Sequence, residues 1–155
     1  MSLTQLSIFN QVAEIQVSYR NEIPAYQRPQ VTCSDDAYRY FLYHWEQDQL
    51  DYCEKFKVML LSRANKVLGI VTISSGGLAG TVADPKMVFG PALKGAAASV
   101  ILGHNHPSGN LTASEADIRL TQKLKECGQA LDLPVLDHLI VTRDGHYSFA
   151  DEGML

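Results

Sequence analysis

Alternating and helically spaced apolar residues predict secondary structure along the first third of the chain. Residues 12–20, VAEIQVSYR, alternate apolar and polar side chains, as in a half-buried strand. A proline-containing connector follows at 21–30, and residues 35–47 then carry apolar side chains at helical spacing. Ser34 and the two aspartates after it predict the N-terminus of that helix, with Ser34 as its cap.

The middle of the chain changes to a composition typical of strands. Residues 56–62 and 66–74 are apolar runs separated by a short Arg-Ala-Asn turn, which predicts a hairpin. The glycine-rich segment 74–82 is expected to be a loop or an irregular strand.

A helix is predicted after Asp84 and Pro85, which suit the cap and the first helical position. Its pattern continues over residues 86–97. Gly90 and Pro91 lie inside that range, so we expect a kink or a restart there.

The last third predicts a buried strand, a helix and a hairpin. Residues 99–103 are apolar, residues 114–131 have helical spacing, and 134–150 read as a hairpin with an Asp-Gly turn. This order of elements predicts an α/β domain with a central mixed sheet and helices on its faces. We expect residues 1–50 to be an N-terminal extension, a strand plus a helix, packed on a core domain of 51–155.

Composition and charge narrow the classes of protein. No apolar run reaches the roughly 18 residues of a membrane helix, and the N-terminus lacks a secretory signal pattern, so we expect a cytoplasmic protein without a membrane partner. The cysteines Cys33, Cys53 and Cys127 are odd in number and not in Cys-x-x-Cys spacing, which favours free thiols in a reducing compartment. A net charge of −4 without a Lys/Arg cluster gives no support for nucleic-acid binding.

The segment GHNHPSGNLTASEAD, residues 103–117, carries the clearest candidate chemistry. Residues two apart in a strand point to the same face, so His104 and His106 can converge on one ion while Asn105 points away. A proline then ends the strand, and the following turn lets Asp117, in the first turn of the next helix, supply a third ligand. Two imidazoles and one carboxylate with an open fourth position are typical of a catalytic zinc site.

The same residues also have a purely structural interpretation. Ser114 and Asp117 have the Ser-x-x-Asp spacing of a capping box at the start of a helix. A His-x-His pair by itself is too common to identify a metal site. The two interpretations are compatible, because a serine that caps a helix can also serve a site.

The complete pattern resembles the JAMM motif of the JAB/MPN metalloprotease superfamily, with His104-x-His106, seven residues, Ser114, two residues and Asp117. The longer string HNHPSGNLTASEADI is similar to the RadC-like branch of that superfamily, as are LDHLIV at 136–141 and YSF at 147–149. The resemblance covers most of the chain. It implies a JAB/MPN-type, cytidine-deaminase-like mixed β-sheet with flanking helices for residues 51–155. RadC proteins of the usual length carry an N-terminal helix-hairpin-helix region, and we expect this chain to be a short form without it.

The resemblance also implies roles for individual residues. His104, His106 and Asp117 would hold Zn²⁺. Glu54, which precedes the strand KFKVMLL, occupies the place of the superfamily's glutamate, which takes a proton from the zinc-activated water and passes it to the leaving amine. Ser114 would donate a hydrogen bond to the oxyanion of the intermediate. The implied reaction is hydrolysis of a peptide or isopeptide bond in a protein or peptide substrate.

Two other functions stay open on this sequence. One is a non-catalytic MPN protein-interaction domain, which the complete ligand set disfavours, and the other is the DNA-repair role suggested by the RadC label, with nucleic acid as the partner. The letters HNH do not make an HNH nuclease motif here. Zinc deaminases need His-x-Glu with Pro-Cys-x-x-Cys, which is absent.

The remaining histidines are weaker candidates. His138, in the apolar run LDHLIV, is either a core histidine with a backbone partner or a residue that orients a metal ligand. We expect His44 and His146 to lie at the surface and Trp45 to lie in the core.

Overall fold

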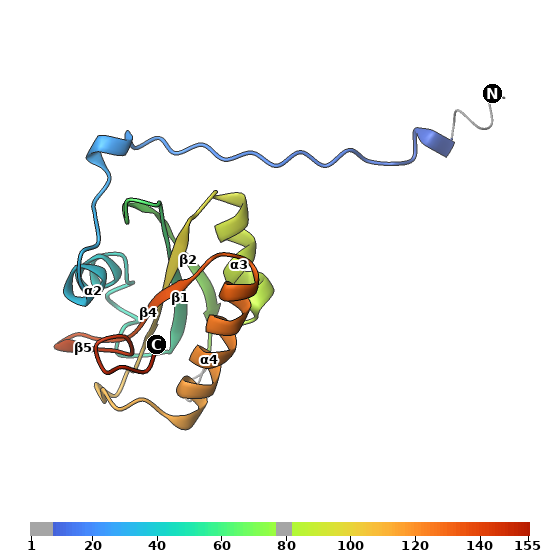
Figure 1. The fold of residues 1–155 in the computed structure, drawn as a ribbon. Coiled ribbons are helices and arrows are strands. Elements are labelled where there is room, and N and C mark those ends of the chain that lie inside the picture. The colour runs from blue at the N-terminus through green and yellow to red at the C-terminus, as the bar shows by residue number, and fades with distance from the viewer. Residues whose placement is uncertain (1–7, 77–81) are drawn as a thin grey trace.

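The computed structural model describes residues 8–76 and 82–155, and these form a five-stranded sheet with helices on both faces (Figure 1). The strand order across the sheet is β2-β1-β3-β4-β5. In chain order the elements are η1 (Ala25–Gln27), α2 (Ser34–Tyr43), β1 (Lys55–Leu61), β2 (Val67–Ser75), α3 (Pro85–Lys94), β3 (Ser99–Asn105), α4 (Glu115–Ala130), β4 (Val135–Thr142) and β5 (Gly145–Ser148).

The sheet is mixed, as the sequence predicts. β1 pairs antiparallel with β2 and with β3, β3 pairs parallel with β4, and β4 pairs antiparallel with β5. The connection from β3 to β4 passes through α4, as parallel neighbours require a crossover. Because β3 and β4 are parallel, side chains near the C-terminal end of β3 lie beside those at the C-terminal end of β4. α4 starts close to this same end of the two strands.

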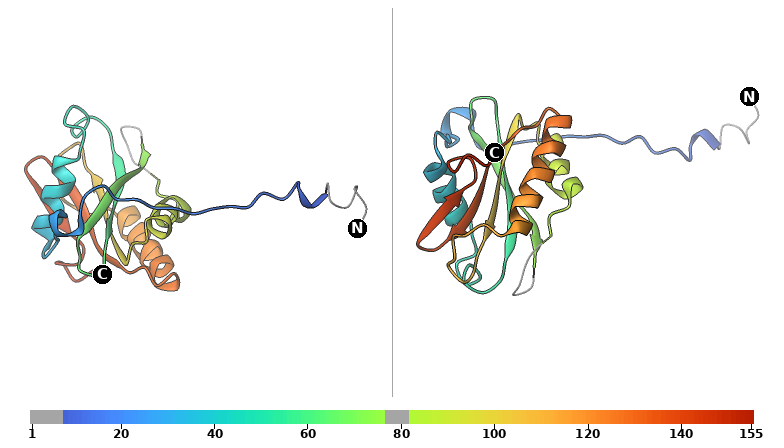
Figure 2. Two further views of the ribbon diagram at one scale, coloured as in Figure 1. Left: turned by 90° about the horizontal axis from the view of Figure 1, so that it is seen from above. Right: turned by 60° about the horizontal axis from the view of Figure 1, so that its bottom comes forward.

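Helices cover both faces of the sheet (Figure 2), and a separate hydrophobic core lies on each face. The alternation of β1 divides its side chains between them: Phe56, Val58 and Leu60 pack with α3 and α4, whereas Met59 and Leu61 pack with α2. α2 lies close to β3 at Gly103, where a Cβ atom would lie 3.0 Å from the ring of Phe41. A side chain at residue 103 would therefore push α2 away from the strand that carries the histidines.

Residues 12–20 do not form the predicted strand. They are extended but unpaired, and Ile15 and Val17 are 86% and 70% exposed, on a segment that runs away from the domain (Figures 1 and 2). Alternation determines which face the apolar side chains take only once a neighbouring strand is present. The nearest edge, at the start of β2, already bonds other residues: the Val67 N–H donates to the Pro29 carbonyl at 2.8 Å, and the Asn21 amide donates to the Leu68 carbonyl at 3.0 Å.

The cap predicted for Ser34 is also wrong. Cys33 is the N-cap of α2 and makes no side-chain cap bond, while Ser34 is the first helical residue. The Ser34 hydroxyl instead donates to the carboxylate of Asp151 at 2.5 Å, which joins α2 to the C-terminal segment.

The helix predicted after Asp84 is present, but it does not restart. The Asp84 carboxylate accepts the Lys86 N–H at 2.9 Å and Pro85 is the first helical residue, as expected. The helix continues to Lys94 through Pro91, because side chains on both sides of the proline, including Val88 and Ala92, are buried in the same core. β2 runs to Ser75, and residues 77–81 of the expected glycine-rich loop lie outside the described residues.

The other predicted elements are confirmed, including the strand before the histidines, the helix after Ser114 and the final hairpin. Trp45 is buried, as predicted. None of the helices within 8–76 and 82–155 is long and apolar enough to span a membrane. The division of the chain at residue 50 stays a prediction.

Candidate metal centre

Three side chains from two elements converge at the end of β3. His104 is in β3, His106 follows that strand directly, and Asp117 lies in the first turn of α4. The Nε2 atoms of the two histidines are 3.0 Å apart. The carboxylate of Asp117 reaches both, with Oδ1 3.3 Å from His104 Nε2 and Oδ2 3.5 Å from His106 Nε2. One ligand atom from each residue lies within 4.8 Å of the others, so this cluster could bind a metal.

The proton of His106 is placed by the turn that follows β3. His106 Nδ1 lies 2.7 Å from the backbone carbonyl oxygen of Asn110. A carbonyl oxygen only accepts, so Nδ1 carries the hydrogen and Nε2 of the neutral ring keeps its lone pair. That lone pair faces His104 and Asp117, which is the arrangement a metal ligand needs.

The electrostatics of the cluster favour a cation at its centre. Burial by itself raises the pKa of Asp117, but the imidazoles of His104 and His106, when protonated, interact with its carboxylate and hold that pKa well below its usual range. The same interaction with Asp117 raises the pKa of His106, although burial opposes it. Both shifts describe a carboxylate that stays ionised beside two imidazoles. The donor set of two nitrogens and one oxygen therefore fits a divalent transition-metal ion.

Ser114 and Asp117 form the predicted capping box at the start of α4. The Ser114 hydroxyl oxygen accepts the Asp117 N–H at 3.0 Å, and the Asp117 carboxylate accepts the Ser114 N–H at 2.9 Å. The second bond uses Oδ2, and Oδ1 is the oxygen nearest His104. The structural and the metal-binding interpretations thus apply to the same residues, because the cap holds the carboxylate beside the histidines.

Glu54 lies directly before β1, at the end of the sheet where β3 delivers the histidines. Phe56 is the register partner of His104 in the antiparallel β1–β3 pair, so the register continued by two residues places Glu54 opposite His106. Residues two apart share a face, which puts Glu54 on the side of the histidines. Its negative charge adds a small upward contribution to the pKa of His106. Glu54 is not a member of the three-residue cluster itself.

The buried His138 of β4 contacts His104 at the ring nitrogen that does not face Asp117. Its Nε2 lies 2.8 Å from His104 Nδ1, and its Nδ1 lies 2.5 Å from the Thr121 hydroxyl oxygen. Full burial, and then the neighbouring His104, lower the pKa of His138 well below its usual range, so the ring is neutral. Of the two interpretations left open, the structure therefore places His138 against a candidate ligand.

Two residues of this neighbourhood were not identified from the sequence. Thr121 is four residues after Asp117, and its hydroxyl donates to the Asp117 carbonyl at 2.7 Å, so helical spacing was the available signal. Asn105 points to the opposite face, as predicted, but its role in holding the chain before Glu54 had no local signal.

The other histidines lie outside the cluster. His44 is exposed, as predicted, and His146 is only half-buried, with its ring stacked on Tyr38 at a centroid distance of 4.7 Å.

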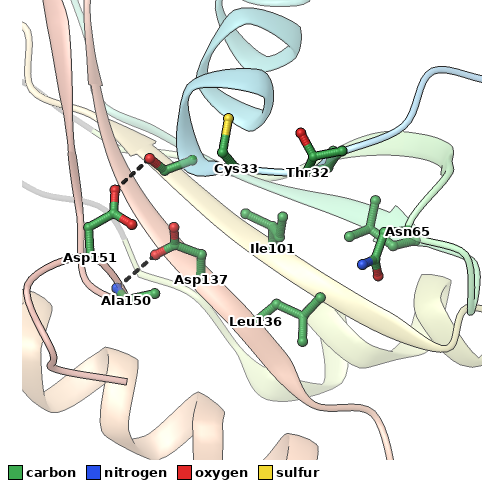
Figure 3. Close-up of a pocket in the computed structure, with 11 residues that line it drawn as sticks. Thr32, Cys33, Asn65, Ile101, Leu136, Asp137, Ala150 and Asp151 are labelled. Atoms are coloured by element: carbon green, nitrogen blue, oxygen red, sulfur yellow. Dashed lines mark hydrogen bonds between the residues drawn. The ribbon is translucent and has the colours of Figure 1, made fainter.

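A separate pocket of about 210 Å³ lies on the α2 side of the sheet (Figure 3). Its polar walls include Cys33, Asp137 and Asp151. Burial raises the pKa of Asp137, yet its carboxylate accepts bonds from the Ser148 hydroxyl at 2.6 Å and the Ala150 N–H at 3.0 Å. These bonds hold the end of β5 against β4, which gives the acidic residue a structural role.

Comparison with known proteins agrees with this geometry. Residues 31–154 match the family model described as the RadC-like JAB domain. A UPF0758 protein of Flavobacterium johnsoniae is 48% identical over 101 residues, which cover 65% of this chain and 44% of that protein. A UPF0758 protein of Salinibacter ruber is 43% identical over 129 residues, 83% of this chain and 54% of that protein. One of Pelobacter propionicus is 38% identical over 124 residues, 80% of this chain and 53% of that protein. This chain spans about half the length of these relatives.

Proposed function

Because this chain belongs to the RadC-like JAB domain family, we propose that it is a zinc-dependent hydrolase of the JAMM type that cleaves a peptide or isopeptide bond. The observation that carries the proposal is the convergence of His104 Nε2, His106 Nε2 and a carboxylate oxygen of Asp117 within 4.8 Å. The substrate is proposed to be a protein or a peptide. Free cysteines are in keeping with a cytoplasmic location.

Zinc is the proposed ion because of the chemistry of the donors. Two imidazole nitrogens and one carboxylate are a common protein ligand set for catalytic zinc, and they leave a coordination position open. Harder ions such as Mg²⁺ prefer sites made of oxygen ligands alone. When bound, the ion supplies Lewis acidity that polarises a carbonyl group and acidifies water.

Glu54 is the proposed general base. The β1–β3 register, continued to Glu54, would put its carboxylate on the β1 side of the histidines, whereas His138 reaches His104 from β4 on the other side of β3. It would accept a proton from the attacking water and deliver that proton to the leaving amine. A carboxylate suits both steps because it can accept a proton and release it again.

Ser114 is the proposed donor to the oxyanion. Its hydroxyl oxygen accepts the Asp117 N–H, so the hydroxyl hydrogen is not used by the helix cap. Ser114 is exposed, which leaves this hydrogen able to meet a substrate. A hydrogen bond made to the developing negative charge stabilises the transition state more than the planar amide.

The test begins with zinc content per chain, measured by elemental analysis after dialysis of wild type, His104→Ala and Glu54→Gln. We expect close to one zinc per wild-type chain, a similar content in Glu54→Gln and almost none in His104→Ala. His44→Ala is the matched control, because His44 is an exposed histidine on the far side of the sheet. Panels of peptides and isopeptide-linked conjugates are then screened, with Glu54→Gln as the inactive variant. Zinc-free wild-type protein after reconstitution would contradict the proposal.

A further inference from the structure

Behind the candidate metal ligands, a chain of hydrogen bonds joins α4 to β4 and β3 and has no role in the proposed reaction. It links the Asp117 carbonyl oxygen to the Thr121 hydroxyl at 2.7 Å, that hydroxyl to His138 Nδ1 at 2.5 Å, and His138 Nε2 to His104 Nδ1 at 2.8 Å. Thr121 and His138 are 2% and 0% exposed, so these direct contacts are shielded from bulk solvent. Each of the three contacts therefore needs one hydrogen from the chain itself.

The hydrogens can be counted. The Asp117 carbonyl only accepts, so the single hydroxyl hydrogen of Thr121 must point to it. The Thr121 oxygen then accepts from His138 Nδ1–H. Because His138 is fully buried and its ring nitrogens contact Thr121 and His104 rather than a carboxylate, the uncharged ring carries this one hydrogen. His138 Nε2 is left bare and accepts from His104 Nδ1. If the hydroxyl donated to His138 instead, two oxygens would face each other at 2.7 Å without a hydrogen between them.

We propose that Thr121 and His138 are positioning residues that keep the imidazole hydrogen of His104 on Nδ1, so that the His104 Nε2 lone pair faces His106 and Asp117. The inference rests on the proposed function, because a lone pair at that atom is what a metal ligand requires. One turn of α4 thus contributes twice: Asp117 supplies a carboxylate, and Thr121 determines the tautomer of the histidine beside it.

Packing holds the rings in place as well. The His138 ring stacks on Phe149 at a centroid distance of 4.8 Å and lies 5.5 Å from Phe56. The His104 ring is parallel to Phe56 at 6.2 Å. Because the phenylalanines fix both ring planes, removal of the Thr121 hydroxyl is expected to move hydrogens rather than rings.

The Thr121→Val variant tests this directly, since valine has nearly the shape of threonine but neither donates nor accepts. His138 Nδ1–H then has no acceptor, and the other tautomer, with the hydrogen on Nε2, becomes favoured. His138 would donate to His104 Nδ1, and the hydrogen of His104 would move to Nε2, where it blocks the ligand position. Thr121→Ser keeps the hydroxyl and is the conservative variant. Thr142→Val is the matched control, because Thr142 is a buried threonine whose hydroxyl bonds Gly145 in the β4–β5 turn.

Two measurements test whether Thr121 and His138 determine the tautomer of His104. Long-range ¹⁵N–¹H correlation spectra of metal-free, ¹⁵N-histidine-labelled protein report which nitrogen of each ring is protonated, and competition with a chelator gives the affinity for Zn²⁺. We expect Nδ1–H on both His104 and His138 in wild type, and the opposite tautomers in Thr121→Val. Affinity for Zn²⁺ should fall about 10- to 100-fold in Thr121→Val, and stay close to wild type in Thr121→Ser and Thr142→Val.

Wild-type His138 protonated on Nε2 would overturn the inference, as would Thr121→Val protein that binds Zn²⁺ as tightly as wild type. Thermal melting of each variant verifies that it folds. Failure of the proposed function looks different: wild-type protein then binds no Zn²⁺, or binds it without hydrolysing any substrate, while the spectra of the metal-free protein still report the tautomers.

Discussion

The side-chain carbonyl of Asn105 accepts the backbone N–H of Lys55 at 2.7 Å, so the strand that carries the histidines also holds the chain next to Glu54. The amide group of Asn105 donates to the carbonyls of Leu50 at 2.8 Å and Cys53 at 2.9 Å. Asn105 is completely buried, and all these bonds lie on the face of β3 opposite His104. One side chain therefore connects the candidate base to the candidate metal ligands.

Replacing Asn105 with alanine should destabilise the protein and misplace Glu54. Three backbone groups lose their partner, two of them in buried hydrogen bonds and one in a partly buried bond, which is expected to cost about 2–4 kcal/mol in the free energy of unfolding. Zinc affinity should change much less than hydrolysis, because the metal ligands are on the other face. Chemical denaturation measures the loss in the free energy of unfolding, and zinc titration measures the affinity for the metal. Asn21→Ala serves as the control, since Asn21 bonds the Leu68 carbonyl at the start of β2, at the opposite end of that strand from Ser75, the register partner of Lys55. Equal losses in both variants would argue against a special role for Asn105.

Ser114 is expected to have two separable roles. Ser114→Ala removes the N-cap of α4 and should lower the free energy of unfolding by about 1 kcal/mol. Asparagine is a good N-cap, so Ser114→Asn should recover most of that stability. If the Ser114 hydroxyl donates to the oxyanion, hydrolysis should be reduced about 10²- to 10³-fold in both variants, including the stable Ser114→Asn. Activity that follows stability across both variants would mean that Ser114 acts only as a cap.

The N-terminal segment should contribute little to the stability of the domain. Residues 12–17 include Val12, Ile15 and Val17, all at least 70% exposed, and the segment lies away from both cores (Figure 2). Deletion of residues 1–17 should therefore leave the melting temperature within about 2 °C of wild type. Differential scanning calorimetry makes the comparison. A large decrease in melting temperature would show that the segment packs on the domain after all.

The parts of the candidate site that depend on the spacing of nearby residues in the sequence could be predicted. The spacing of His104 and His106 in a strand, and that of Ser114 and Asp117 at a helix start, depend on a few consecutive residues, and all four lie as expected. The contact between Thr121 and His138 joins residues 17 apart, and it exists only because β4 is the parallel neighbour of β3 beneath α4.

The two wrong predictions, the strand at 12–20 and the Ser34 cap, also depend on partners that are distant in the sequence. Whether residues 12–20 become a strand depends on a free edge, and whether Ser34 caps α2 depends on Asp151, which is 117 residues away. Neither the sheet order nor the path of the C-terminal segment is written in the local pattern. The fold class was predictable because it follows from the order of strand and helix patterns, whereas long-range partners required the structure.

Acid should weaken one ion-pair group away from the candidate metal centre. The Glu46 carboxylate lies 3.3 Å from Lys55 Nζ and 3.0 Å from Lys57 Nζ, and both lysines are buried. Burial raises the pKa of Glu46, but a backbone hydrogen bond and the two ammonium groups outweigh it and lower the pKa to about 2. A carboxyl whose folded pKa lies below its usual value of 4.5 stabilises the protein above that value, and the stabilisation disappears as the pH falls towards 2.

Glu46→Gln should therefore destabilise the protein at neutral pH, and the difference from wild type should shrink between pH 4.5 and 2. The Glu46 side chain is 44% exposed, so solvent screens the pair and the expected loss is about 1 kcal/mol. Urea denaturation at a series of pH values measures it. Glu126→Gln, at an exposed position on α4, is the control and should show no such pH dependence. A constant difference between wild type and Glu46→Gln from pH 7 to pH 3 would mean that the carboxylate does not stabilise the buried lysines.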